Sequence, residues 1–237
     1  MAPRTLARSI VASFLPLCGA YSTQMPSRLN AVHARPLSRR ASRNPVATAA
    51  TTSRFITGET GNNVTPYIEA LIGRNLHLQK DHPLGIIKAK IENYFNSLEG
   101  NDFAIVDNLD PVVNAQECFD DLLIPADHPG RKPSDTYYIS RPGGKELSSA
   151  VDTLLRTHTS AHQSTLMRSG KEAFLCTGDV YRRDEIDASH FPAFHQMEGV
   201  KLFDPAAVGG AMTKEEWLAS DECQLVAADL KRTLEGM

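Results

Sequence analysis

The first 54 residues contain no aspartate, no glutamate and no lysine, although they hold eight arginines, and the first acidic residue is Glu59. They are rich in alanine, serine and threonine, and they carry five prolines. A chain of this composition cannot bury enough apolar surface to offset the entropy that is lost on ordering. We therefore expect residues 1–54 to be a disordered leader outside the fold. Arginine without acidic residues is typical of an organellar transit peptide, most simply a mitochondrial one.

A long apolar segment is also lacking. The uncharged run from Ile10 to Tyr21 is shorter than the roughly 20 apolar residues that cross a bilayer, and Pro16 interrupts it, so we expect no membrane partner. Its small residues at 18–20 could instead end a secretory signal. Because more arginine-rich chain follows, the run suits a bipartite plastid leader better than secretion. We expect the mitochondrial matrix, with plastid or dual targeting as the alternative.

Cysteine is scarce, with four residues and no Cys-x-x-Cys pair. Cys18 lies in the leader, which leaves Cys118, Cys176 and Cys223 in the body of the chain. An odd number of widely spaced cysteines argues against a disulfide scaffold or a zinc ribbon. It fits a reducing compartment. Cys176, in an apolar run, is interpreted as a small buried residue.

The body, residues 55–237, is acidic and long enough for one domain. Its 17 basic and 28 acidic residues give a formal charge of −11. Hydrophobic periodicity and capping residues predict helices at 66–72, 81–100 and 213–234, with part of 151–166 also helical. Extended segments are predicted at 103–113, 137–139, 173–181 and 194–203, and a loop at 125–135. Separate helices and strands with a hairpin at the centre indicate an α+β fold, an antiparallel sheet flanked by helices.

The hairpin at 177–203, TGDVYRRDEIDASHFPAFHQMEGVKLF, concentrates polar residues. Side chains alternate across a strand, so Gln196 and Glu198 share one face. If the hairpin closes near Ser189, Arg182 lies opposite Gln196 and His190 is offered from the loop. Such a surface can bind a phosphate through the guanidinium and an ammonium through the carboxylate. Spacing alone favours the simpler interpretation, which is a solvated polar face with a structural salt bridge.

Four segments together resemble one enzyme family. TGDVYRRDEIDASHFPAFHQMEG resembles motif 2 of class II aminoacyl-tRNA synthetases, in the form used by phenylalanyl-tRNA synthetases. DHPLGIIKAKIENYF at 81–95 is similar to the motif 1 helix, with Pro111 where motif 1 ends, and HPGRKPSDTYY at 128–138 resembles the His-Pro-Gly-Arg loop of that family. LLRTHTSAHQ at 154–163 resembles its amino-acid-binding segment. The segments run in the order of the family, and the leader is similar to that of the mitochondrial single-chain type.

The resemblance implies ATP-dependent attachment of phenylalanine to tRNA-Phe through phenylalanyl-adenylate, with Mg²⁺ and in a monomer. Arg182 and His190 would act on the α-phosphate, by charge and positioning rather than by a covalent nucleophile. The substrate site implied by the resemblance consists of His158, Ser160, His162, Gln163, Arg182, Ser189, His190, Phe191, Gln196, Met197 and Glu198.

Other nucleotide and metal motifs do not compete with this reading. Gly143-Gly144-Lys145 lacks the spacing of a phosphate-binding P-loop. His158 and His162 have no third ligand at a fixed offset, so we predict no metal bound by the protein. Arg131 and Lys132 could contact tRNA, although basic loop residues are usually just solvated.

A Gly-rich motif 3 with its arginine has no counterpart after Phe203, and no anticodon-binding domain is recognised. We therefore expect the chain to resemble the first half of such an enzyme, and to form no phenylalanyl-adenylate by itself. The alternative is a non-catalytic paralogue that acts as an RNA-binding or regulatory module. A biotin or lipoate ligase is disfavoured, because THTS and FHQMEG both fit phenylalanyl-type enzymes.

Overall fold

The computed structural model describes residues 10–13, 60–98, 102–142, 149–183, 190–203, 216 and 219–237. The helices within these ranges are α1 (Pro66–Glu69), α2 (Pro83–Ser97), α3 (Ala115–Cys118), α4 (Gln163–Arg168) and α6 (Asp221–Glu235). The strands are β1 (Ile10–Ser13), β2 (Ala104–Val106), β3 (Val112–Asn114), β4 (Tyr138–Ser140), β5 (Thr153–Leu155), β6 (Ala173–Tyr181) and β7 (Ala193–Lys201). Short 3₁₀ turns are η1 (Leu76–Leu78), η2 (Asp120–Leu122), η3 (Pro129–Arg131) and η4 (Thr159–His162).

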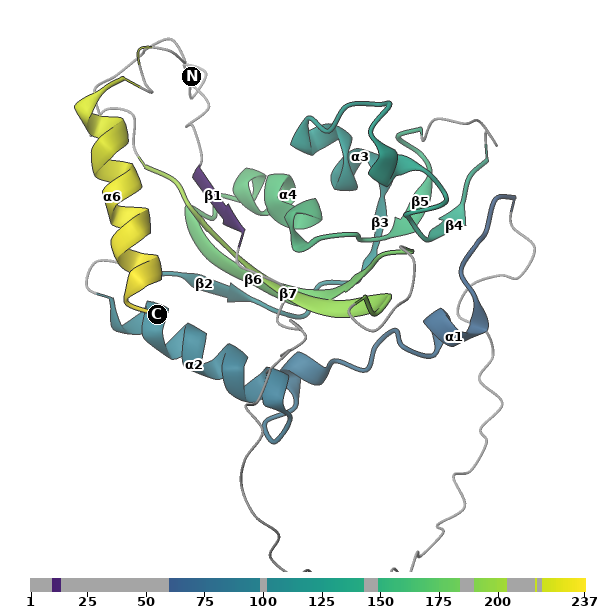
Figure 1. The fold of residues 1–237 in the computed structure, drawn as a ribbon, viewed down its shortest axis with the longest axis horizontal. Helices are drawn as coiled ribbons and strands as arrows, with labels where there is room; N and C mark the ends of the chain where they lie inside the picture. Colours follow the sequence, from purple (N-terminus) through teal and green to yellow (C-terminus); the bar gives the residue numbers. More distant parts are fainter. Residues whose placement is uncertain are drawn as a thin grey trace, which may run out of the picture.

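The strands form two sheets (Figure 1). One has the order β1-β7-β6-β2 and the other, smaller one the order β3-β5-β4. The predicted α+β class is confirmed, and all pairs are antiparallel except β2 with β6. Parallel neighbours require a long crossover connection. Here the connection from β2 to β6 contains the whole smaller sheet, which is why the main sheet is mixed.

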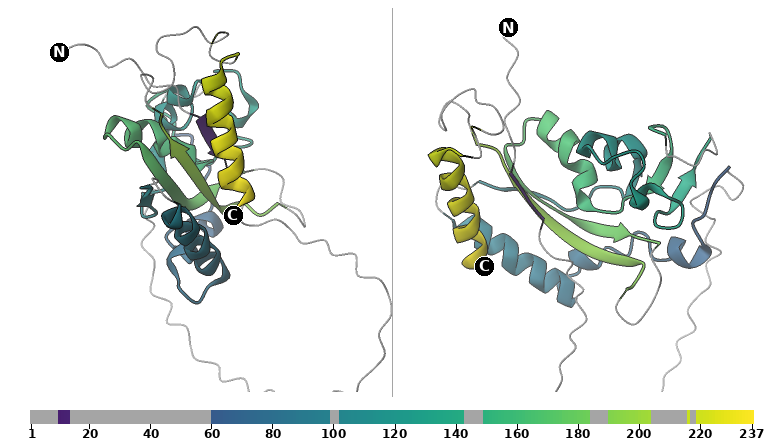
Figure 2. Two further views of the ribbon diagram at one scale, coloured as in Figure 1. Left: turned by 90° about the vertical axis from the view of Figure 1, so that its left-hand side faces the viewer. Right: turned by 45° about the horizontal axis from the view of Figure 1, so that its top comes forward.

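The predicted hairpin is confirmed as β6 and β7, which pair over nine residues each. Both faces of the hairpin are covered by helices, so apolar residues are buried on both sides. Cys176 and Val200 pack on the α4 side. Leu175 and Met197 face the other way and pack against Phe95 of α2. Figures 1 and 2 show α2 and α4 on opposite sides of the hairpin, with α6 beside the end of β7.

Helix α2 is confirmed, and so is most of its buried face. The apolar spacing predicts that this face consists of Leu84, Ile87, Ile91, Tyr94, Phe95 and Leu98, and Phe95 is in a core cluster against which Ile91, Tyr94 and Leu98 pack. His82 caps it, since its Nδ1 accepts the N–H of Leu84 at 3.2 Å. Ile87, expected in the core, is 40% exposed, whereas Lys88 is buried. Lys88 can be buried because its ammonium lies 2.7 Å from Glu92 and 2.6 Å from Asp107. Tertiary ion pairing thus overrides the hydrophobic pattern at this position.

Residues 151–166 are only partly helical, as expected, and their first part is a strand that the sequence did not reveal. β5 is the middle strand of the smaller sheet. Leu154 and Leu155 are both fully buried, each in a different core cluster. Successive side chains of a strand point to opposite faces, so two neighbouring residues are both buried when each face is covered by a packed layer. A strand of three residues is too short for hydrophobic periodicity to reveal it.

Helix α6 begins later than expected. Its N-cap is Ser220, whose hydroxyl accepts the N–H of Cys223 at 3.1 Å. The expected cap, Thr213, lies outside the described residues. Val226 is the buried residue of the helix, and Lys201 on β7 pairs with Asp229 at 3.0 Å.

Part of the leader joins the sheet, although we excluded the leader from the fold. β1 lies along the outer edge of β7, with Ile10 opposite Lys201 and Ser13 opposite Glu198. An edge strand presents unpaired N–H and C=O groups, and an uncharged segment with β-branched residues can satisfy them. Residues 1–9 and 14–59, which include the rest of the expected disordered leader, lie outside the described ranges.

Candidate functional site

The polar residues predicted for the site gather on the α4 side of the hairpin. Gln196 and Glu198 share this face, and Glu198 pairs with Cys176 across the strands. Gln196 lies opposite Gly178, so our prediction that Arg182 lies opposite Gln196 is wrong. Arg182 is four residues further along, where its N–H bonds to the carbonyl of Pro192 at 2.9 Å. A small shift in where the turn is centred moves every cross-strand partner, and loop length alone does not fix that centre.

Glu198 is a buried carboxylate at the middle of this face, with 2% of its surface exposed. Its Oε2 accepts hydrogen bonds from the hydroxyls of Ser160 at 2.5 Å and Thr159 at 3.4 Å. Burial raises the pKa of Glu198, and the two hydroxyls oppose that rise. Within the described ranges no lysine, arginine or histidine forms an ion pair with it. A cation supplied from outside would therefore relieve the cost of burying this charge.

Gln196 provides an unused acceptor on the same face. The residue is 8% exposed, and among the described residues its Oε1 is buried without a hydrogen-bond partner. An unsatisfied buried carbonyl costs free energy, which a ligand donor would recover. Gln163 at the start of α4 is also buried, at 7% exposure. The face therefore offers a carboxylate and amide groups to a ligand with N–H donors.

Arg182 lies at the far end of β6 and is oriented by two neighbours. Its Nε donates to the carbonyl of Thr157 at 3.1 Å, and the carbon of its guanidinium lies over the ring of Phe194, 5.2 Å from the ring centre. One N–H and one face of the guanidinium are thus engaged. The fork keeps further donors with which to bind an anion.

Two histidines of the amino-acid segment lie beside this face. Burial, followed by the charge of Arg182, lowers the pKa of His158 to about 4. Burial, followed by the charge of Arg156, lowers the pKa of His162 to about 4. Both rings are therefore neutral at physiological pH. They can serve as hydrogen-bonding groups there but not as cations.

The residues expected from the hairpin loop are only partly described. His190 is exposed, as is Phe191, half of whose surface is accessible. Ser189 lies outside the described residues. The structure therefore brings His158, Ser160, His162 and Gln163 together with Gln196 and Glu198, and it leaves His190 and Phe191 at the margin.

Met197 does not belong to this face. It is 1% exposed and packs with Phe95, Phe103 and Leu175 on the α2 side of the hairpin. Because side chains alternate along β7, a residue between Gln196 and Glu198 must point the opposite way. Our assignment of the Met197 side chain to substrate contact is corrected to a core role.

Comparison with known proteins places this site in a family. The profile described as "tRNA synthetases class II core domain (F)" matches residues 68–209, which is more than half of the chain. The chain belongs to this family. The class II core thus includes α2, both sheets apart from β1, and the full β6–β7 hairpin.

Three curated relatives of this chain are all named as phenylalanine--tRNA ligases. The chain is 47% identical over 189 residues to "Phenylalanine--tRNA ligase, mitochondrial" of Dictyostelium discoideum, covering 74% of this chain and 39% of that protein. It is 44% identical over 178 residues to "Phenylalanine--tRNA ligase, chloroplastic/mitochondrial" of Arabidopsis thaliana, covering 74% and 37%. For the mitochondrial protein of Rattus norvegicus the identity is 48% over 146 residues, covering 60% and 29%. The chain spans two fifths or less of the length of these relatives.

Sequence reasoning missed three residues of the class II site. Thr159 bonds to Glu198, and Phe194 supports Arg182. Arg156 is 1% exposed and bonds to His162. The available signal was adjacency, since Arg156 and Thr159 belong to the same RTHTS run as His158. Their roles depend on contacts with distant strands, which the run alone does not specify.

Arg131 has a structural position rather than one suited to tRNA. It is 4% exposed, lies 2.7 Å from Asp120, and sits 5.0 Å from the ring centre of Phe119. Its carbonyl accepts the hydroxyl of Tyr138 at 2.6 Å. The basic residue that we considered as an RNA contact therefore holds the loop at 125–135 onto the core.

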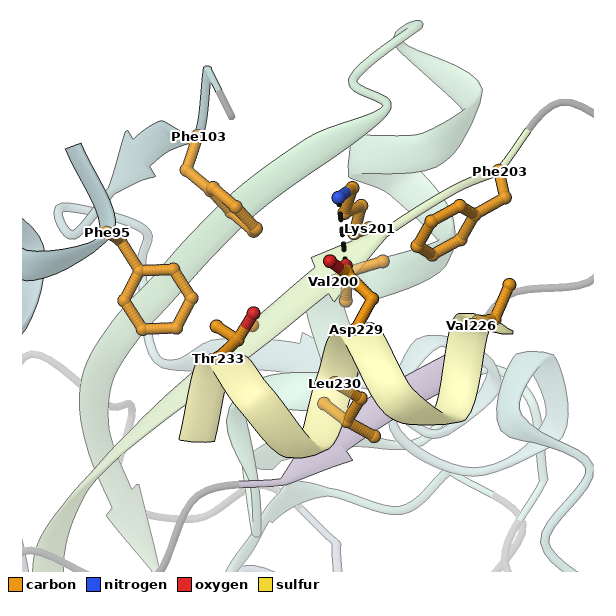
Figure 3. A pocket seen from close by; sticks show the side chains of 10 residues that line it. Phe95, Phe103, Val200, Lys201, Phe203, Val226, Asp229, Leu230 and Thr233 are labelled. Atoms are coloured by element: carbon orange, nitrogen blue, oxygen red, sulfur yellow. Dashed lines mark hydrogen bonds and ion pairs between the residues drawn. The ribbon is translucent and has the colours of Figure 1, made fainter. Parts of the chain in front are cut away.

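Two cavities lie away from the polar face. A pocket of about 40 Å³ lies between α2, β7 and α6, and the paired side chains of Lys201 and Asp229 are among its lining residues (Figure 3). Its walls are mainly apolar, with Phe95, Phe103, Phe203 and Leu230 around it. A larger one, about 320 Å³, lies between the start of α2 and the loop end of the hairpin. Neither is lined by Gln196 or Glu198.

The helices in the described part of the chain are not of the kind that spans a bilayer. None of them is both long enough and apolar enough to cross one.

Proposed function

We propose that this chain takes part in ATP-dependent attachment of phenylalanine to tRNA-Phe for organellar translation, through phenylalanyl-adenylate and as a single-chain monomer. The observation that carries the proposal is Glu198, a buried carboxylate that receives hydroxyl hydrogen bonds and no cation among the described residues. It lies within the class II core, and the curated relatives are phenylalanine--tRNA ligases.

The amino acid would bind through its ammonium group. Glu198 would pair with the ammonium while Ser160 holds the carboxylate oxygen in place, and Oε1 of Gln196 would accept one of its N–H bonds. Bound charge of opposite sign favours the ionised carboxyl and so lowers the pKa that burial raises. His158, His162 and Gln163 would line the same space.

The nucleotide would bind toward the loop end of the hairpin, where β6 leads into β7. Arg182 would hold the α-phosphate while a phenylalanine carboxylate oxygen attacks the phosphorus in line and the bond to the bridging oxygen breaks, which releases pyrophosphate. His190 would assist, with Ser189 and Phe191 nearby. Developing negative charge on phosphate oxygens is stabilised by a guanidinium that is already oriented, here by Thr157 and Phe194. We assign Mg²⁺ to the phosphates of ATP, where it would neutralise charge, rather than to named side chains.

The organelle is inferred from two independent features. Residues 1–54 have the composition of a transit peptide, and the relatives are named mitochondrial or chloroplastic/mitochondrial. We propose the mitochondrial matrix, with plastid or dual targeting as the alternative. A non-catalytic RNA-binding or regulatory role is not favoured, because the carboxylate, amide and guanidinium of the site are all present and oriented.

The test is binding of a non-hydrolysable phenylalanyl-adenylate analogue, measured by calorimetry beside the tyrosyl analogue. Wild type should bind the phenylalanyl form and discriminate against a phenol whose hydroxyl lacks a partner. Arg182→Ala should weaken binding about 10² to 10³-fold, the loss expected for a preorganised charged donor.

The matched control is Arg183→Ala, since Arg183 is exposed and its side chain bonds to the carbonyl of Pro133 instead. It should bind the analogue within about threefold of wild type. Because we expect this chain to form no phenylalanyl-adenylate by itself, analogue binding is the readout rather than ATP–pyrophosphate exchange. Equal losses in the two arginine variants, or equal binding of both analogues, would falsify the proposal.

A further inference from the structure

Arg156 is the largest fully buried side chain of the described chain, and it joins four segments. Its Nε donates to the carbonyl of Asp179 at 2.6 Å and its Nη2 to the carboxylate of Asp179 at 2.7 Å. Its Nη1 reaches the carbonyl of Leu109 at 3.2 Å and Nε2 of His162 at 2.9 Å. The guanidinium is therefore fixed between β6, the segment before β3, and η4.

Gly178 makes room for this guanidinium. A Cβ atom at Gly178 would lie 2.1 Å from Nη2 and 2.8 Å from Cζ of Arg156. The guanidinium is held by four hydrogen bonds and cannot move aside freely. Since Gly178 pairs with Gln196, Arg156 lies over the hairpin beside Gln196, whose buried Oε1 has no hydrogen-bond partner among the described residues.

The contact with His162 determines where the ring carries its proton. A guanidinium has only donors and does not lose its proton in proteins. The Nε2 atom of His162, 2.9 Å from Nη1, must therefore accept. A neutral imidazole that accepts at Nε2 is protonated at Nδ1. Among the described residues no acceptor is found for that Nδ1–H, which leaves it for a ligand or water.

We propose that Arg156 is a positioning residue that holds His162 neutral and protonated at Nδ1, so that the ring presents a hydrogen-bond donor, and no cation, to the amino-acid site. The tautomer stands on the geometry alone. Its effect on substrate rests on the proposed function, in which the site must accept an ammonium group.

The charges around His162 support this assignment. Arg156 follows β5, Asp110 precedes β3, and His158 precedes η4. Burial is the main influence that lowers the pKa of His162 to about 4, Arg156 adds to it, and Asp110 opposes it. If the pKa of His162 were raised instead, its ring would be positively charged beside the ammonium group of the amino acid. Burial, with the charge of Arg156 beside it, keeps the ring uncharged across the physiological range.

The direct test is ¹⁵N NMR of histidine side chains in labelled protein, with His162 assigned by the signals lost in His162→Gln. We expect a protonated Nδ1, an unprotonated Nε2, and no titration of this ring above pH 5. A proton on Nε2, or a titration midpoint near the ordinary value of about 6.5, would overturn the proposal whatever the protein does with phenylalanine.

Two variants test the role of Arg156 from opposite sides of the contact. Arg156→Lys keeps the charge but not the fork, and Gly178→Ala leaves Arg156 in place while pushing its guanidinium away. Both should restore exchange between the two His162 tautomers and weaken the phenylalanyl-adenylate analogue about three- to tenfold, with ATP affinity changed less than twofold. Circular dichroism checks that each variant folds, and the wild-type spectrum decides the tautomer even if Arg156→Lys does not.

Arg168→Lys is the matched control, because Arg168 is exposed and pairs with Asp121 at 2.9 Å, away from His162. It should leave both the His162 signals and ligand affinity unchanged. If the wild-type tautomer is as expected but neither variant alters analogue affinity, the link to substrate is wrong. If wild type binds no analogue at all, the proposed function fails while the spectrum still decides the Arg156–His162 contact.

Discussion

The buried carboxylates of the described chain differ in their partners. Asp152 faces Arg141 at 3.4 Å and Asp179 faces Arg156 at 2.7 Å. Glu198 receives hydroxyl hydrogen bonds only. A hydroxyl offsets part of the cost of burying a charge, whereas an ion pair offsets more. Glu198 therefore lowers stability in the empty protein, and that is the property expected of a residue kept for a cationic ligand.

Glu198→Gln should make the empty protein more stable at pH 7. The pKa of the folded carboxyl is raised, so the native state binds the proton more tightly than the unfolded state, and stability is lost as pH rises through that interval. Removing the charge should recover about 0.5 to 2 kcal/mol and flatten the pH dependence. Urea unfolding at pH 5 and pH 7 measures both.

The same variant should lose most of its affinity for the phenylalanyl-adenylate analogue, because the neutral amide cannot pair with an ammonium group. Glu172→Gln, at an exposed position before β6, is the control and should change neither property. A Glu198→Gln protein that is less stable than wild type at pH 7 would show that the carboxylate is structural.

At the scale of elements, α6 is held to the rest of the molecule by few buried groups. Val226 is 3% exposed, whereas its neighbour Leu225 is 69% exposed. Beyond these, the hydroxyl of Tyr94 on α2 donates to the carbonyl of Thr233 at 2.8 Å, and Lys201 pairs with Asp229. The helix closes the small apolar cavity shown in Figure 3.

Val226→Ala should therefore destabilise the protein by about 1 to 3 kcal/mol, since it enlarges a cavity whose walls are already fixed. Leu225→Ala removes a larger side chain but should cost less than about 0.5 kcal/mol. Denaturant midpoints of the two variants make the comparison. Equal losses would mean that α6 does not pack as described.

Some helices and strands could be predicted from local sequence patterns and others could not. Helix α2 and the strands of the hairpin were predictable because capping by His82 and runs of apolar residues are local signals. Strand β5 was not, because a three-residue segment becomes a strand only between β3 and β4. The burial of Lys88 was hidden as well, because Asp107 reaches it from outside the helix.

At the scale of the whole molecule, the leader and the class II core have opposite electrostatic character. Residues 1–54 hold eight arginines and no acidic residue, while residues 55–237 carry a formal charge of −11. Arginine-rich segments are drawn across membranes whose inner side is negative. The leader composition is therefore suited to import, and the acidic body is not.

A reporter fused to residues 1–54 should accumulate in mitochondria or plastids, as seen by fluorescence microscopy beside organelle markers. Replacing the eight arginines with glutamine should leave it in the cytosol, because the electrical driving force is lost. Secretion of the unmodified fusion, or its retention in the cytosol, would contradict the prediction.

The family of this molecule and most of its candidate site residues could be predicted from the amino-acid sequence alone. The resemblance of the 154–163 and 177–199 segments to one family needed no coordinates, because those residues are fixed by local motifs, and the family is confirmed. Tertiary structure decided which of them face one another. The register of β6 against β7 separated Arg182 from Gln196, put Met197 in the core, and placed Arg156 over Gly178. Cross-strand register and buried hydrogen bonds join residues that are far apart in the chain, and so they are settled only when the whole sheet packs.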